Sequence, residues 1–137
     1  MMFMNVRIIA VLLTGIVAAG AAYAKKYPLT AASEVPGARG KLETGKDRNG
    51  NTKLKLEAEH LAEPGKLSPP RTAYVVWLQE KGAEPASQGQ LRVDKNLKAK
   101  FESTTPAKSF DLFVTAESDP GSRLPGGTEV FRVSVQD

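Results

Sequence analysis

Hydrophobic and polar residues alternate along most of the chain beyond residue 37, and this pattern predicts β-strands. In the range 52–61, leucines and alanines alternate with lysines and glutamates, which gives the predicted strand one apolar and one charged face. The range 74–78 is apolar at every position, as is typical of a strand covered on both faces. The seven predicted strands are 38–46, 52–61, 72–79, 88–94, 97–103, 110–118 and 128–135.

Turn-forming residues separate these strands. Asn49 and Gly50 tolerate positive φ angles, so they predict a tight hairpin between the first two strands. A second hairpin is predicted around residues 94–96, after which Leu97 is expected to face the core. The range 61–70 contains three prolines, which cannot donate backbone hydrogen bonds, and we expect it to be a long connection between two sheets.

Seven short strands separated by turns predict an all-β fold, namely an immunoglobulin-like antiparallel two-sheet sandwich over residues 38–137. A small barrel is the alternative architecture, because the periodicity of the strands is the same in both. Residues 25–37 are expected to form a flexible N-terminal arm.

The range 1–24 has the pattern of a secretory signal peptide. Arg7 supplies a short positive region, the range 8–22 is apolar, and Ala22 and Ala24 form a small-residue cleavage site. We therefore expect an N-terminal signal helix that is cleaved after Ala24. The product is expected to be periplasmic or secreted, and to contact a membrane only through this segment if it is kept.

Composition excludes several kinds of chemistry. The chain has no cysteine, so disulfides, cysteine-ligated metals and thiol nucleophiles are excluded, and we expect no cofactor. The formal net charge is +4, and Arg7 is the one charged residue of the signal segment, so the mature chain carries +3. Because its lysines and glutamates alternate, we interpret the charge as a solvated sheet face and expect no nucleic-acid partner.

Two polar motifs have structural interpretations as well as chemical ones. Asp47, Asn49 and Asn51 resemble the start of a calcium loop, but the sixth and twelfth positions lack the required Gly and Glu, and a hairpin explains the same residues. His60 is the only histidine, and we interpret it as a structural residue that continues the inward phase of its strand. Trp77 is expected to be a central core residue rather than a platform for a sugar ring.

The loop that follows the sixth predicted strand holds the candidate site. Glu117, Asp119 and Arg123 carry charges of both signs in a segment rich in glycine and proline, and loops carry function more often than rigid faces do. We expect these three residues to contact a partner. The alternative is a hydrolytic site in which Glu117 and Asp119 act as paired carboxylates.

From the third strand onwards, the chain reads AYVVWLQ over residues 73–79, GAEPASQGQLRVD over 82–94 and FDLFVTAESDPGSRLPGGTEV over 110–130. These stretches resemble the extracytoplasmic C-terminal domain of anti-sigma-K factors. In that family a Tyr-x-x-Trp-Leu strand precedes a glycine-containing hairpin, and a Val-Thr-x-Glu strand precedes a loop of Gly, Pro and Ser. The matching positions are Tyr74, Trp77, Leu78, Gly89, Val114, Thr115, Glu117, Gly121 and Ser122.

The resemblance implies a free-standing sensor or partner-binding domain and supplies no catalytic residues. It does not extend to sigma-factor inhibition, because the family's sigma-binding region carries a His/Cys zinc motif and this chain has no cysteine. The sequence therefore predicts an exported, non-enzymatic β-sandwich that binds a protein or envelope component. A small carbohydrate-active or other hydrolytic domain is the alternative.

Overall fold

A computed structural model describes residues 23 and 25–136, and the expected signal helix of residues 1–24 lies outside this part except for Tyr23. No helix among the described residues is long and apolar enough to span a membrane. All seven predicted strands are confirmed, with boundaries shifted by a few residues. The elements are β1 (Lys25–Ala31), β2 (Arg39–Lys46), β3 (Thr52–Glu59), the 3-10 helix η1 (Pro64–Lys66), β4 (Ala73–Gln79), β5 (Ala86–Leu91), β6 (Ala99–Thr105), β7 (Phe110–Glu117) and β8 (Thr128–Val135).

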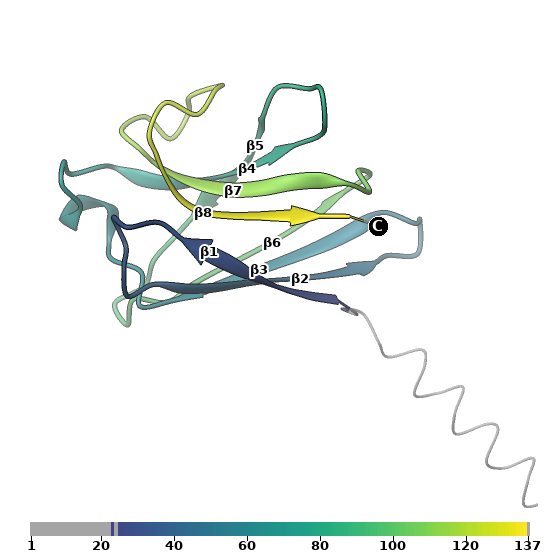
Figure 1. The fold of residues 1–137 in the computed structure, drawn as a ribbon, viewed down its shortest axis with the longest axis horizontal. Helices are drawn as coiled ribbons and strands as arrows, with labels where there is room; N and C mark the ends of the chain where they lie inside the picture. The colour runs from purple at the N-terminus through teal and green to yellow at the C-terminus, as the bar shows by residue number, and fades with distance from the viewer. Residues whose placement is uncertain (1–22, 24, 137) are drawn as a thin grey trace, which may run out of the picture.

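The eight strands form one antiparallel sheet that curves until it is nearly closed into a barrel (Figure 1). The strand order is β5-β4-β7-β8-β1-β2-β3-β6. The predicted two-sheet immunoglobulin-like sandwich is therefore wrong, and the barrel alternative is the observed architecture. The sequence pattern did not distinguish them, because strands alternate inward and outward residues in a sandwich and in a barrel.

β1 joins the two halves of the sheet. Its first five residues pair with β2, and its last two pair with β8. The sequence predicted a flexible arm over residues 25–37, whereas β1 lies inside the strand order with Leu29 buried. Pro28 weakens the strand pattern because it has no N–H group. It is tolerated because this part of β1 pairs with β2 alone, which leaves its other edge without a ladder.

Tyr23 precedes β1 and belongs to the predicted signal segment. Its ring centroid lies 5.1 Å from Lys53 Nζ and 5.7 Å from Lys55 Nζ, which are cation–π distances. The predicted cleavage after Ala24 removes this contact. It also makes Lys25 the first residue both of the mature chain and of β1.

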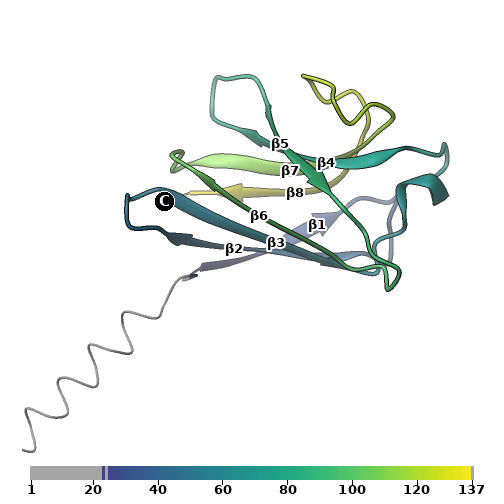
Figure 2. The ribbon, with the colours of Figure 1, turned by 180° about the vertical axis from the view of Figure 1, so that it is seen from behind.

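The barrel remains open along the seam between β5 and β6, the two ends of the strand order (Figure 2). An isolated bridge between Val93 and Ala99 connects the strands near their hairpin. Further along, Gly89 of β5 has a φ of 130°, and a Cβ atom there would lie 3.3 Å from the Phe101 ring of β6. The Phe101 ring therefore packs against the backbone of β5 and covers part of the seam.

Inward-facing residues fill the barrel with one apolar core. The Tyr74 hydroxyl donates a 2.5 Å hydrogen bond to the carbonyl oxygen of Ala62, which ties the β3–β4 connection to β4. Burial raises the pKa of Tyr74 to about 12. The largest fully buried residues of this core are Leu42, Leu54, Leu56, Leu61, Tyr74, Val76, Leu91, Leu112, Val114 and Phe131.

A smaller apolar cluster, which we call the outer-face cluster, consists of Val75, Trp77 and Phe113 on the outer side of β4 and β7. Trp77 is fully buried, as predicted, but in this cluster rather than inside the barrel. Its ring nitrogen donates a 2.8 Å hydrogen bond to Thr115 Oγ1. The guanidinium of Arg132 lies 4.3 Å from the centroid of the Phe113 ring and covers it. β4 is therefore buried on both faces, as its apolar sequence predicted.

Hairpins at opposite ends of the barrel share one turn geometry. In each, an aspartate (Asp47 or Asp94) exchanges hydrogen bonds with the residues that follow it, and the fourth residue of the turn has a left-handed backbone. Hydrogen bonding to the backbone N–H of Asn51 lowers the pKa of Asp47. The fourth residue is Gly50 in one turn, with a φ of 80°, and Leu97 in the other, with a φ of 61°. Leu97 is 40% exposed, so the prediction that it faces the core is wrong.

We expect Leu97→Gly to raise the free energy of unfolding by about 1 kcal/mol. A side chain in the left-handed region costs about 1–2 kcal/mol, and the greater chain entropy of glycine offsets part of the gain. The reciprocal variant Gly50→Leu is expected to lower stability by a similar amount. Urea denaturation of both variants measures this. A less stable Leu97→Gly variant would show that packing of the leucine side chain outweighs the backbone cost.

Candidate functional site

Glu117, one of the three predicted loop residues, is buried at the end of β7. Its carboxylate accepts hydrogen bonds from the N–H groups of Gly126 at 3.2 Å and Gly127 at 3.1 Å, and from the Thr115 hydroxyl. Because Thr115 also accepts the indole N–H, one polar chain links the outer-face cluster to the loop of residues 118–127. Glu117 therefore fixes this loop against the barrel.

The other two predicted residues lie on the surface of the same loop. Asp119 Oδ1 accepts the N–H of Gly121 at 2.9 Å, and the Asp119 carbonyl accepts the N–H of Ser122 at 3.2 Å. Arg123 is exposed and makes no hydrogen bond or ion pair with another described residue. Asp119 and Arg123 are thus open to a partner, whereas the carboxylate of Glu117 is occupied by groups of its own chain.

The calcium-like motif forms the first of the two hairpin turns. Asp47 Oδ1 accepts the N–H groups of Asn49 at 2.8 Å and Asn51 at 2.9 Å, so this carboxylate oxygen holds the turn together. Within the described part of the chain, no three or more His, Cys, Asp or Glu side chains form a group that could hold a metal ion.

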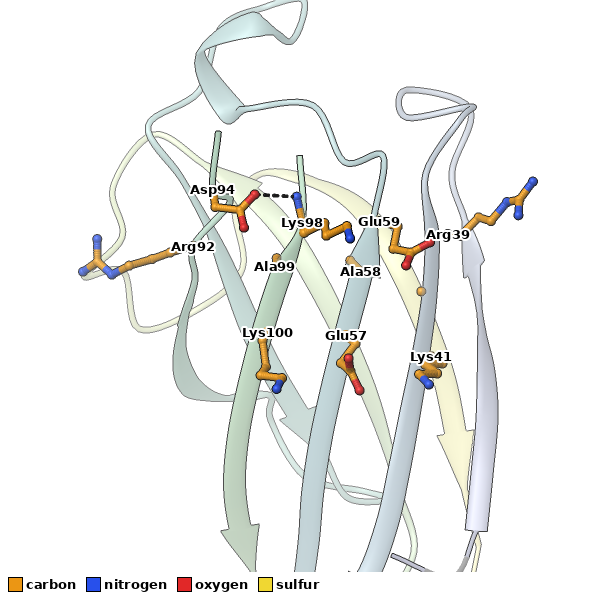
Figure 3. A pocket seen from close by; sticks show the side chains of 11 residues that line it. Arg39, Lys41, Glu57, Ala58, Glu59, Arg92, Asp94, Lys98, Ala99 and Lys100 are labelled. Atoms are coloured by element: carbon orange, nitrogen blue, oxygen red, sulfur yellow. Dashed lines mark hydrogen bonds between the residues drawn. The ribbon is translucent and has the colours of Figure 1, made fainter. Parts of the chain in front are cut away.

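An open groove of about 720 Å³ lies on the outer face of β2, β3 and β6, at the end where the β5–β6 hairpin turns (Figure 3). Most of its lining is charged, with more cationic than anionic side chains, and we call it the basic groove. The cationic residues are Arg39, Lys41, Arg92, Lys98 and Lys100, and the anionic residues are Glu57, Glu59 and Asp94.

Strand register places carboxylates between the cations. Glu57 of β3 lies between Lys41 of β2 and Lys100 of β6, and Glu59 lies opposite Arg39. Opposite charges on neighbouring strands stabilise a sheet by about 0.2–1 kcal/mol per pair. Part of the charge in the basic groove therefore lies beside opposite charge, although none of these cross-strand neighbours forms an ion pair among the described residues.

The positive charge of the groove nevertheless exceeds what its carboxylates balance. Lys41 forms an ion pair with Glu43 at 3.3 Å, and Glu57 forms one with Lys55 at 3.7 Å. The carboxylate of Asp94 accepts backbone N–H groups of its own turn. Four groove cations have no ion-pair partner among the described residues, and these are Arg39, Arg92, Lys98 and Lys100.

Two exposed residues with left-handed backbones lie beside the basic groove, at the end where the β5–β6 hairpin turns. They are His60, with a φ of 55°, and Leu97, and such angles are uncommon outside glycine. The N–H of Leu61 donates a 3.0 Å hydrogen bond to the Leu97 carbonyl, which holds the two segments together. His60 does not continue the inward phase of its strand as predicted, because β3 ends at Glu59.

The sequence did not predict the basic groove. Its charges come from three strands and a hairpin whose register is unknown before folding, and the alternating lysines and glutamates were interpreted as a solvated face. One sequence pattern does mark the hairpin turn at the end of the basic groove. Residues 94–98 repeat the Asp-x-Asn pattern of residues 47–51, with leucine in the place of glycine.

Comparison with protein-family models and with curated protein sequences finds no match for this chain. The resemblance to the extracytoplasmic domain of anti-sigma-K factors therefore stays a prediction from the sequence.

Proposed function

We propose that the chain is an exported, non-enzymatic binding domain whose partner is a protein or another component of the bacterial envelope. The signal-peptide pattern of residues 1–24 supports a periplasmic or secreted location. The observation that carries the binding function is the basic groove and its four cations without ion-pair partners among the described residues. Unbalanced surface charge attracts and orients a partner of opposite sign.

A hydrolytic function through Glu117 and Asp119 has less support. Paired catalytic carboxylates must flank the scissile bond of a bound substrate. Glu117 accepts three hydrogen bonds within its own chain at a buried position, and Asp119 holds its own turn.

Retention of envelope components tests the proposal. The mature domain, residues 25–137, is immobilised and exposed to detergent-solubilised bacterial envelope extract, in parallel with the variant Arg39→Gln/Lys98→Gln. We expect the wild type to retain a small set of components saturably, and the variant to bind them about fivefold more weakly because two exposed charges are lost. The matched control is Arg48→Gln/Lys81→Gln, which removes the same charge outside the groove.

Two outcomes contradict the proposal. One is that the wild type retains no more than an unrelated protein of equal net charge. The other is turnover of a glycan or an ester by the wild type that Glu117→Gln abolishes while the variant remains folded, which supports the hydrolytic alternative.

A further inference from the structure

Leu97 adopts a left-handed backbone that is unfavourable for a leucine, although its turn does not require a leucine at this position. The equivalent position of the other hairpin is Gly50, which makes the same hydrogen bonds in a conformation that glycine adopts freely. Leu97 instead holds a large apolar side chain, 40% exposed, on a left-handed backbone. Strained residues of this kind cluster at active sites, ligand clamps and switch regions.

Two cations follow this leucine in the chain. Lys98 and Lys100 are two residues apart, line the basic groove, and have no ion-pair partner among the described residues (Figure 3). Residues i and i+2 of an extended chain are about 6.7 Å apart and project to the same side. An extended peptide with acidic side chains at alternate positions therefore matches both lysines at once.

The carboxylates of the groove favour a narrow ligand over a broad anionic surface. Glu57 and Glu59 lie on β3, next to the two lysines of the β6 side. A flat anionic membrane would approach these carboxylates together with the lysines, whereas a single chain that lies along Lys98 and Lys100 contacts mainly the cations. The exposed Glu102 follows on the same face of β6, so this match is confined to the first part of the strand. The described lining also has no aromatic ring on which a sugar could stack.

We propose that the basic groove binds an extended acidic segment of a partner protein, with Lys98 and Lys100 contacting alternate carboxylates and Leu97 contacting an apolar side chain next to them. This inference rests on the proposed binding function and specifies its site and the chemistry of its partner. Recognition of an extended segment through charges and one apolar contact is a common mode of peptide binding.

The test uses a fluorescein-labelled ten-residue peptide with glutamate at alternate positions and a leucine at one end. Its affinity for the mature domain is measured by fluorescence anisotropy, beside a peptide with glutamine in place of glutamate. We expect Lys98→Gln/Lys100→Gln to weaken binding about fivefold. The control Arg48→Gln/Lys81→Gln is expected to stay within about twofold of the wild type, because its lost charges lie outside the groove.

Leu97→Gly separates a binding role from a structural one. We expect this variant to melt at a higher temperature than the wild type and yet to bind the acidic peptide several-fold more weakly. A purely structural role for the leucine predicts higher stability with unchanged affinity, and that result overturns the apolar contact.

Three further results overturn the inference. The first is that the glutamine peptide binds as tightly as the glutamate peptide. The second is that the control variant weakens binding as much as Lys98→Gln/Lys100→Gln does. The third is that phosphatidylglycerol vesicles displace the peptide, which indicates that the groove binds a membrane surface. The broader binding function fails separately, when the wild type retains nothing from envelope extract. If the variant Lys98→Gln/Lys100→Gln retains the same components as the wild type, the broader binding function stands and this inference fails.

Discussion

Trp77→Ala is expected to lower the free energy of unfolding by about 3–5 kcal/mol, which is a large part of the stability of a small domain. The substitution empties the centre of the outer-face cluster, where Trp77 is fully buried. It also removes the N–H that Thr115 Oγ1 accepts, and Thr115 in turn donates to Glu117. Loss of the tryptophan therefore disturbs the contacts that fix the following loop. Urea denaturation of the mature domain measures the change.

Trp77→Phe is the matched control for this prediction. It keeps an aromatic ring in the cluster and loses the ring N–H, so we expect a smaller loss, about 1–2 kcal/mol for the hydrogen bond and the reduced volume. A Trp77→Ala variant with an unchanged urea midpoint would place the side chain at the surface. A Phe variant as unstable as the Ala variant would show that the polar chain contributes more than the packing.

Gly127→Ala is expected to cost about 3 kcal/mol or more, because the new methyl group meets backbone that no rotamer change can move. An added Cβ at Gly127 would lie 1.7 Å from the carbonyl oxygen of Ala116, deep inside contact distance. The strands must separate there, although the N–H of Gly127 is bonded to Glu117. Thermal unfolding followed by circular dichroism measures the loss.

The neighbouring glycine provides the control. A Cβ at Gly126 would have the Glu117 Oε1 atom as its nearest neighbour, at 3.8 Å, which is an ordinary contact. We therefore expect Gly126→Ala to change stability by about 0.5 kcal/mol or less. If both alanine variants unfold at the same temperature as the wild type, the loop is not held against β7 as described.

The strands were predictable because each carries its own alternation of apolar and polar residues, as the buried Leu54, Leu56 and Ala58 of β3 show. The joining of the two halves into one sheet was not, because it depends on one strand that pairs first with β2 and then with β8. That strand, β1, contains a proline and two leading lysines, which conceal its alternation. Local pattern therefore identified the elements but did not establish their arrangement.

The candidate site was likewise predictable where it depends on local sequence and not where it depends on distant contacts. Asp119 and Arg123 were correctly placed in an exposed loop, but the burial of Glu117 depends on Gly126 and Gly127, nine and ten residues further along the chain. Such a contact has no local signal, since a glutamate at the end of a strand is usually exposed. The basic groove depends in the same way on the register of three strands.

The pairing of β1 with β8 has a consequence for how the chain folds. Thr30 lies opposite Arg132, so the sheet joins its first strand to its last and gives the fold a high contact order. Pairing two segments that lie so far apart in the chain costs loop-closure entropy. The β2–β3 hairpin, by contrast, forms from neighbouring residues. The chain therefore cannot complete this sheet until its last strand is available to pair with its first.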